Sequence, residues 1–215
     1  MPWVGKDYAK GYEGKKILVM GHVHVCGGCD ECSMEYHKGP CPKDMTSLAV
    51  RNYLNWEKGE YEPDPEYKKW LCTYRNFTKA IFGTDDYSYE ECESLWNHIM
   101  FYNYVQTSMS EWYEQPNDDM YNMSELPFAQ VLKAYKPDLI IVWGSRAYGM
   151  APWGNKELKI EGQELEPICT DEWSEPCYEY SYDNHVTRMM KIHHPSMYFS
   201  WSKYHELIMK FLKQM

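Results

Sequence analysis

Polar residues with acid–base and hydrogen-bonding chemistry follow short apolar runs at several points of the sequence. They are His22 and His24 after the first run, Asn103 in the second, Ser145 and Arg146 after the third, and His193 and His194 after the last. A neutral histidine takes up a proton near neutral pH. An asparagine amide offers a donor and an acceptor side by side. These residue types favour a common binding or catalytic site, provided that the fold gathers them.

The apolar runs predict buried strands, and the segments between them predict helices. The expected strands cover residues 17–20, 99–105, 139–144 and 186–192. The expected helices cover about 46–56, 70–82, a segment capped by Ser124 that ends near Lys136, and a C-terminal segment from about residue 200. This alternation predicts an α/β fold with three layers, α/β/α, around a central, mainly parallel sheet. Because ligands bind beyond the carboxyl ends of such strands, we expect the polar residues to meet in one crevice.

No internal repeat or low-complexity linker divides the sequence. Residues 107–123 and 151–182 have the composition of irregular loops, apart from a short strand expected at 158–160. The length suits one domain with a sizeable core. We therefore expect a single domain over residues 1–215, with a Cys-rich loop inserted at about 26–43.

Half of the eight cysteines lie in this Cys-rich loop. Cys29, Cys32, His37 and Cys41 follow one another at spacings close to those of a zinc knuckle, in a segment rich in Gly and Pro. Sulfur and imidazole ligands in this pattern suit a tetrahedral Zn²⁺ ion, so the sequence predicts a structural zinc site, with Cys26 able to replace one ligand. Free thiols and a disulfide are the alternatives.

The composition predicts a globular protein with a net acidic charge. The chain has 22 Lys and Arg against 32 Asp and Glu, a net charge of −10, and 44% of its residues are hydrophobic. This excludes collagen-like and disordered classes, and it predicts only a weak non-specific grip on duplex DNA. No apolar run approaches the roughly 18 residues of a membrane span, and the first residues lack the apolar stretch of a secretory signal. We expect a cytoplasmic protein with no membrane partner.

Four segments, in order along the chain, resemble motifs of the uracil-DNA glycosylase superfamily. Residues 17–24 (ILVMGHVH) are similar to its first motif, a strand that ends in Gly before the residues that position the attacking water. Residues 101–106 (FYNYVQ) resemble the strand whose Asn hydrogen-bonds the flipped pyrimidine. Residues 137–147 (PDLIIVWGSRA) resemble a structural strand that ends in Gly, and residues 194–196 (HPS) resemble the second catalytic motif.

The resemblance implies a uracil-DNA glycosylase-like fold and an enzyme of base-excision DNA repair. Such an enzyme hydrolyses the N-glycosidic bond of uracil or another damaged pyrimidine that has left the base stack. The resemblance implies that Asn103 reads the pyrimidine edge and that Gly21 and Ser196 belong to the substrate-binding set, Ser196 by holding a phosphate. His194 would donate to the oxygen that becomes negative as the base leaves.

The first motif departs from the family pattern. His22 and His24 stand where active members commonly place Asp, Glu or Asn to orient water or to stabilise positive charge on the sugar. No carboxylate follows Gly21 before Asp30. A neutral histidine can act as the general base instead, so His22 and His24 join His194 as the expected catalytic residues.

Two other functions fit the same residues. His22, His24, His193 and His194 could bind the catalytic ion of a metal-dependent hydrolase. A catalytically silent relative of the glycosylases could use the same crevice to bind a nucleotide or a partner. Each residue also has an ordinary structural explanation, such as backbone hydrogen bonds of strand-end histidines or a capping role for Asn103.

Overall fold

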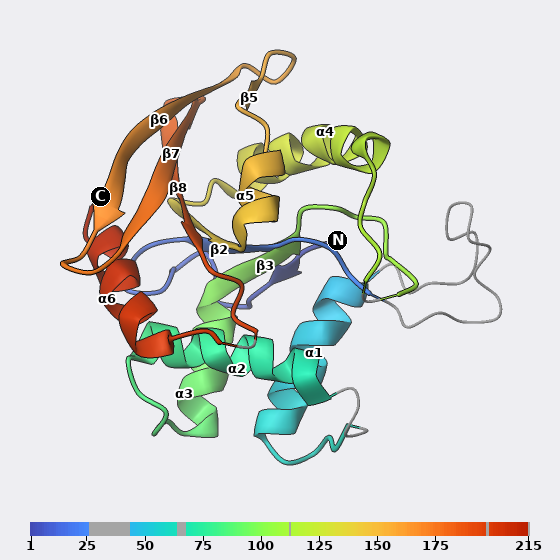
Figure 1. The fold of residues 1–215 in the computed structure, drawn as a ribbon, viewed down its shortest axis with the longest axis vertical. Helices are drawn as coiled ribbons and strands as arrows, with labels where there is room; N and C mark the ends of the chain where they lie inside the picture. Colours follow the sequence, from blue (N-terminus) through green and yellow to red (C-terminus); the bar gives the residue numbers. More distant parts are fainter. Residues whose placement is uncertain (26–43, 64–67, 112, 197, 215) are drawn as a thin grey trace.

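A computed structural model of the protein describes residues 1–25, 44–63, 68–111, 113–196 and 198–214. Their helices and strands follow one another along the chain as shown in Figure 1. The elements are β1 (Trp3–Val4), β2 (Ile17–Gly21), α1 (Met45–Glu57), α2 (Lys68–Phe82), α3 (Tyr89–His98), β3 (Ile99–Asn103), α4 (Asp118–Tyr135), β4 (Leu139–Trp143), α5 (Ser145–Met150), β5 (Gly154–Asn155), β6 (Ile160–Cys169), β7 (Ser174–Tyr182), β8 (His185–Ile192) and α6 (Trp201–Leu212).

One sheet joins all strands of the described residues, in the order β1-β3-β2-β4-β8-β7-β6-β5. The neighbours β3, β2, β4 and β8 run parallel, and every residue of β2, β3 and β4 is buried. Strands covered on both faces are apolar without interruption, which is why their runs were recognisable. The expected α/β class and the parallel centre of the sheet are confirmed.

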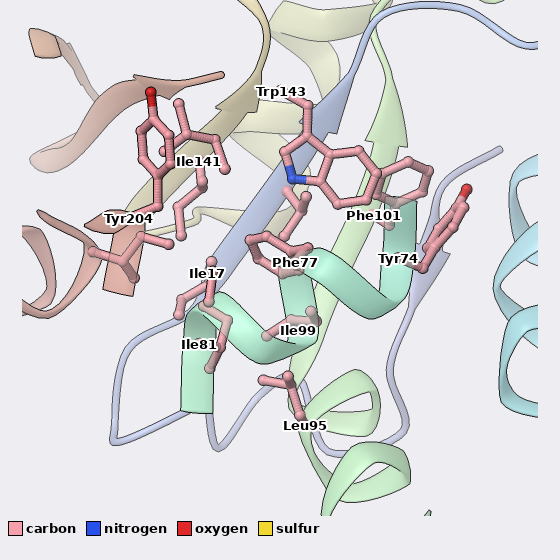
Figure 2. Packing of buried hydrophobic residues seen from close by; sticks show 14 of the residues in the cluster. Ile17, Tyr74, Phe77, Ile81, Leu95, Ile99, Phe101, Ile141, Trp143 and Tyr204 are labelled. Atoms are coloured by element: carbon pink, nitrogen blue, oxygen red, sulfur yellow. The ribbon is translucent and has the colours of Figure 1, made fainter. Parts of the chain in front are cut away.

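Helices cover both faces of the parallel centre, so the expected three layers are present (Figure 1). α1, α2, α3 and α6 pack on one face, around alternate strand residues such as Val19, Phe101 and Trp143. Figure 2 shows this core, in which Trp143 lies against Phe101 and Phe77. α4 and α5 pack on the other face against the intervening residues, such as Met20 and Tyr102. We call these the α2 face and the α4 face.

The prediction that residues 151–182 form a loop is wrong, because most of this segment forms the antiparallel strands β6 and β7. β7 pairs with β8 through a two-residue turn, Asp183-Asn184, in which both residues have positive φ. This is the backbone that a tight hairpin turn requires. Polar side chains on the exposed side of both strands hid the apolar pattern that the parallel strands display. Antiparallel strands also flank the other edge, where β1 pairs with β3.

Two helices differ from the sequence prediction: α4 begins earlier than expected, and α3 was not expected. α4 begins at Asp118, where Asn117 accepts a hydrogen bond from the Met120 amide at 3.0 Å. Ser124 is therefore not the cap, and its hydroxyl donates to the carbonyl of Met120 at 2.7 Å instead. α3 lies in a segment without an expected helix and is capped by a reciprocal Ser88–Glu91 pair. No helix of the described ranges is long and apolar enough to cross a membrane.

Candidate functional site

The parallel strands end side by side in the order β3, β2, β4, β8, and we call these four ends the carboxyl edge. β2 comes first in the chain, with β3 on one side of it and β4 on the other. A sheet whose winding changes direction in this way opens a crevice at the carboxyl ends of its strands. β3 and β8 are separated by β2 and β4. They therefore lie about 14 Å apart, a span that two side chains and a small planar ring can bridge.

Asn103 ends β3 directly opposite Gly21, which ends β2. The asparagine is 4% exposed, and its side chain lies so close to Gly21 that a Cβ atom at that position would overlap with Oδ1 of Asn103. The backbone carbonyl of Asn103 accepts a hydrogen bond from the side chain of Gln106. Its side-chain amide has no hydrogen-bond partner among the described residues. The amide thus presents an unused donor and an unused acceptor at the carboxyl edge.

His22 follows β2 and leans towards the α4 face, where it meets Tyr121. Its Nε2 lies 2.7 Å from the hydroxyl oxygen of Tyr121, and the two rings stack with their centroids 5.7 Å apart. Burial lowers the pKa of His22 to about 4, and the charges of Arg146 and His194 lower it in the same direction. The imidazole is therefore neutral at pH 7, which a general base requires.

His24 connects the end of β2 to α1. Its Nε2 lies 2.9 Å from the hydroxyl of Thr46, and its carbonyl accepts the Met109 amide at 2.7 Å. Burial lowers the pKa of His24 to about 4. The neutral ring is thus tied to α1 and the backbone to the segment after β3, which holds the residues that directly follow β2 in place.

His194 follows β8 and packs edge-on against Trp143, the last residue of β4, with ring centroids 6.2 Å apart. Trp143 also contacts Phe101, as Figure 2 shows. Because Asn103 comes two residues after Phe101 in the same strand, it points to the same face. His194 and Asn103 therefore both lie at the top of the α2 face. Although His194 is exposed on one side, the protein around its ring lowers its pKa.

The segment after His194 is tied to α2. The side-chain amide of Asn76 donates to the carbonyl of Pro195 at 2.9 Å, and the backbone N–H of Ser196 donates to the carbonyl of His194 at 2.7 Å. The Ser196 amide is thus engaged within the loop, and the hydroxyl remains as the group that could contact a phosphate. Tyr198 follows closely, and its side chain is 98% exposed.

Glu175 is a buried carboxylate at the carboxyl edge that sequence reasoning missed. It lies near the start of β7, beside the end of β8, and is 2% exposed. Tyr204 donates to its Oε1 at 2.7 Å, and the Lys191 ammonium lies 2.9 Å from its Oε2. The Nε2 of His193 is 3.9 Å away. These contacts fasten the end of β8 to α6.

The structure does not bring the four histidines of the alternative metal site together as one ligand set. His22 bonds Tyr121, His24 bonds Thr46 and His193 turns towards Glu175. Within the part of the chain that the structure describes, no group of three or more His, Cys, Asp or Glu could hold a metal ion.

The predicted zinc ligands, Cys29, Cys32, His37 and Cys41, lie outside the described residues. Elemental analysis of the purified protein tests them. One zinc per chain would support the site, and a metal-free protein would remove it.

Neither the models of known protein families nor the curated proteins contain a match to this chain.

Proposed function

We propose that the protein is a uracil-DNA glycosylase-like hydrolase, which removes a flipped uracil or another damaged pyrimidine from DNA. The proposal includes a uracil-DNA glycosylase-like arrangement of the sheet. The order of the four sequence motifs and the carboxyl edge at which their polar residues end support it. The observation that carries most weight is the state of Asn103. The residue is 4% exposed, its side chain lies against Gly21, and the side-chain amide has no hydrogen-bond partner in the described residues.

The Asn103 amide matches the edge of a pyrimidine. Uracil presents a carbonyl next to an N–H, and an asparagine presents a donor next to an acceptor. A polar pair of this kind rejects a ligand that leaves either group unpaired, because buried polar groups without partners are costly. Asn103 would therefore select the base, while Gly21 leaves space for the amide to take its position.

The two neutral histidines would divide the proton chemistry. His22 takes a proton from water as its oxygen attacks C1′ of the sugar. The glycosidic bond breaks, and the base leaves with the bonding electron pair. His194 donates a hydrogen bond to the base oxygen that becomes negative. The departing base then takes up a proton from solvent and His22 releases the water proton to solvent, so the products are a free pyrimidine and an abasic sugar and the enzyme returns to its starting state. A neutral His22 before attack avoids repulsion of the positive charge that develops on the sugar.

The charge of the protein favours a single-stranded substrate. With a net charge of −10, the chain gains little from the phosphates of a long duplex. The exposed ring of Tyr198, which follows His194 closely in the sequence, offers a stacking surface for an unpaired base. Arg146 is a cation near His22, where it lowers the histidine pKa and can contact a single phosphate.

The test is incubation with single-stranded DNA that contains one uracil, followed by alkali, which cleaves at abasic sites. We expect cleavage by the wild-type protein and at least about a 100-fold slower reaction with Asn103→Ala. Asn55→Ala, on the exposed side of α1, is the matched control. Strand cleavage that is absent even with enzyme in large excess would refute the proposal. Uracil binding without cleavage would instead indicate a silent pyrimidine-binding protein.

A further inference from the structure

The contact between His22 and Tyr121 constrains how the histidine can act. The Nε2 atom of His22 is 2.7 Å from the phenol oxygen, and the stacked rings, inclined by 20°, prevent the imidazole from turning freely. Because Nε2 is engaged, only Nδ1 remains to face a reacting molecule. Of the two neutral tautomers, only the one with its proton on Nε2 leaves a lone pair on Nδ1.

We propose that Tyr121 is a positioning residue, which accepts a hydrogen bond from the Nε2–H of His22 and so leaves Nδ1 to take the proton from water. This proposal rests on the proposed function and names the residue that orients its general base. Tyr121 itself does not contact the reacting atoms. Its role is similar to that of any partner that fixes a histidine tautomer through the far ring nitrogen.

The surroundings of Tyr121 suit a fixed support. The residue is 6% exposed and lies in the first turns of α4, directly after the Asn117 cap. Further along the helix, Phe128 packs against Tyr104 with ring centroids 5.7 Å apart, which anchors α4 to the segment after β3. Burial raises the pKa of Tyr121, so its phenol stays neutral beside the neutral His22.

The experiment compares Tyr121→Phe with wild type in the full-length protein. Tyr121→Phe keeps the stacked ring and removes the hydroxyl. Tyr135→Phe, in the same helix, is the control, because the Tyr135 hydroxyl makes no hydrogen bond with the described residues and its ring packs on Tyr8. Proton–nitrogen correlation spectra of labelled histidine, with His22 assigned through His22→Gln, report which ring nitrogen carries the proton. Steady-state assays on uracil-containing single strands give kcat and KM.

We expect the wild-type spectrum to show the His22 proton on Nε2 and the Tyr121→Phe spectrum to show a mixture of tautomers. We expect kcat to fall about 10-fold to 100-fold with KM unchanged within about twofold, because orientation and not binding is lost. Tyr135→Phe should match wild type in both measurements. A wild-type proton on Nδ1, or a Tyr121→Phe variant with unchanged tautomer and kcat, would overturn the proposal. If wild type releases no base, the proposed function fails, and the spectra alone decide the role of Tyr121.

Discussion

The parallel strands and the β6–β7 hairpin share one sheet, but they treat polar side chains differently. In the parallel part, β2, β3 and β4 are buried throughout, and polar groups such as Asn103 stand where the strands end. In the hairpin, the tyrosine hydroxyls of β7 lie within the strand and are paired. The hydroxyls of Tyr178, Tyr180 and Tyr182 donate to the carbonyls of Trp153, Pro152 and Leu132 at 2.8, 2.8 and 3.0 Å. The Asn103 amide is therefore unused at the end of its strand, whereas these three hydroxyls of β7 are satisfied.

Substitution of His194 should give the largest difference between the two regions. Removing one donor to a developing oxyanion typically lowers a rate by about 100-fold to 1000-fold. We therefore expect His194→Ala to lose this much base release from uracil-containing single strands, with the melting temperature nearly unchanged. His98→Ala, at the C-terminal end of α3, is the control. Equal losses in both variants would contradict the role given to His194.

Acid should weaken the loop at the end of β2 through its two half-buried histidines. The pKa values of His22 and His24 are lowered to about 4, below the ordinary value of 6.5. As the pH falls, the unfolded chain therefore binds protons before the folded protein does, and the free energy of unfolding should fall between about pH 6.5 and pH 4. Above about pH 6.5 both states are neutral at these residues, so the histidines add no pH dependence to the free energy of unfolding. Between pH 7 and pH 5, we expect a loss on the order of 2 kcal/mol for each histidine.

Denaturant unfolding at pH 7 and pH 5 measures this dependence. His24→Gln should reduce the difference between the two free energies, because it removes one of the two groups. His98→Gln should leave the difference as in wild type. An equal pH dependence in wild type and His24→Gln would show that His24 is as easily protonated in the folded protein as in the unfolded chain.

Gly21 tests whether the position of the Asn103 amide matters. Gly21→Ala introduces a methyl group that overlaps with Oδ1 of Asn103, so the amide must move. We expect base release to fall about 10-fold, the size of effect that a small misplacement produces. Gly149→Ala in α5 is the control, because no atom lies within 4 Å of its added carbon. Unchanged activity in Gly21→Ala would separate Asn103 from substrate binding.

A substitution in the hairpin should lower the stability of the protein and leave its activity unchanged, and this is the smallest effect that we expect. Tyr182→Phe removes hydrogen bonds to the Leu132 carbonyl and the Thr187 hydroxyl. We expect the free energy of unfolding to fall by about 1 kcal/mol and base release to stay at the wild-type rate. Denaturant unfolding and the alkali assay check both. A variant with intact stability and reduced activity would place the hairpin in the site after all.

The parallel part of the fold was predictable because its strands are covered on both faces. That environment demands uninterrupted apolar runs, which the sequence shows at β2 and β4. The polar residues that end these strands could therefore be assigned to one edge without knowledge of any contact. The strands β6 and β7 give no such run, although Asp183-Asn184, the turn that joins β7 to β8, tolerates positive φ and could have indicated that β7 is a strand.

The supporting residues of the candidate site were beyond prediction for a different reason. Tyr121 belongs to the part of α4 that precedes Ser124, where acidic and amide residues resemble a loop. Glu175 belongs to a strand that the sequence did not indicate. Their contacts with His22 and Lys191 join residues far apart along the chain, and no periodic pattern encodes such pairs. The Ser88–Glu91 pair, in contrast, is a local capping pattern from which α3 could have been found.

β1 gives the strand that carries Asn103 a neighbour on its outer side. Trp3 and Val4 pair with Phe101 and Met100, and the Trp3 indole donates to the carbonyl of Trp96 at 2.9 Å. Without β1, the apolar strand β3 would lie at the edge of the sheet with unpaired backbone N–H and C=O groups, and such an edge is a template for intermolecular strand addition. A fusion or deletion that disturbs the first five residues is therefore a hazard for aggregation, and recombinant forms are better tagged away from Trp3.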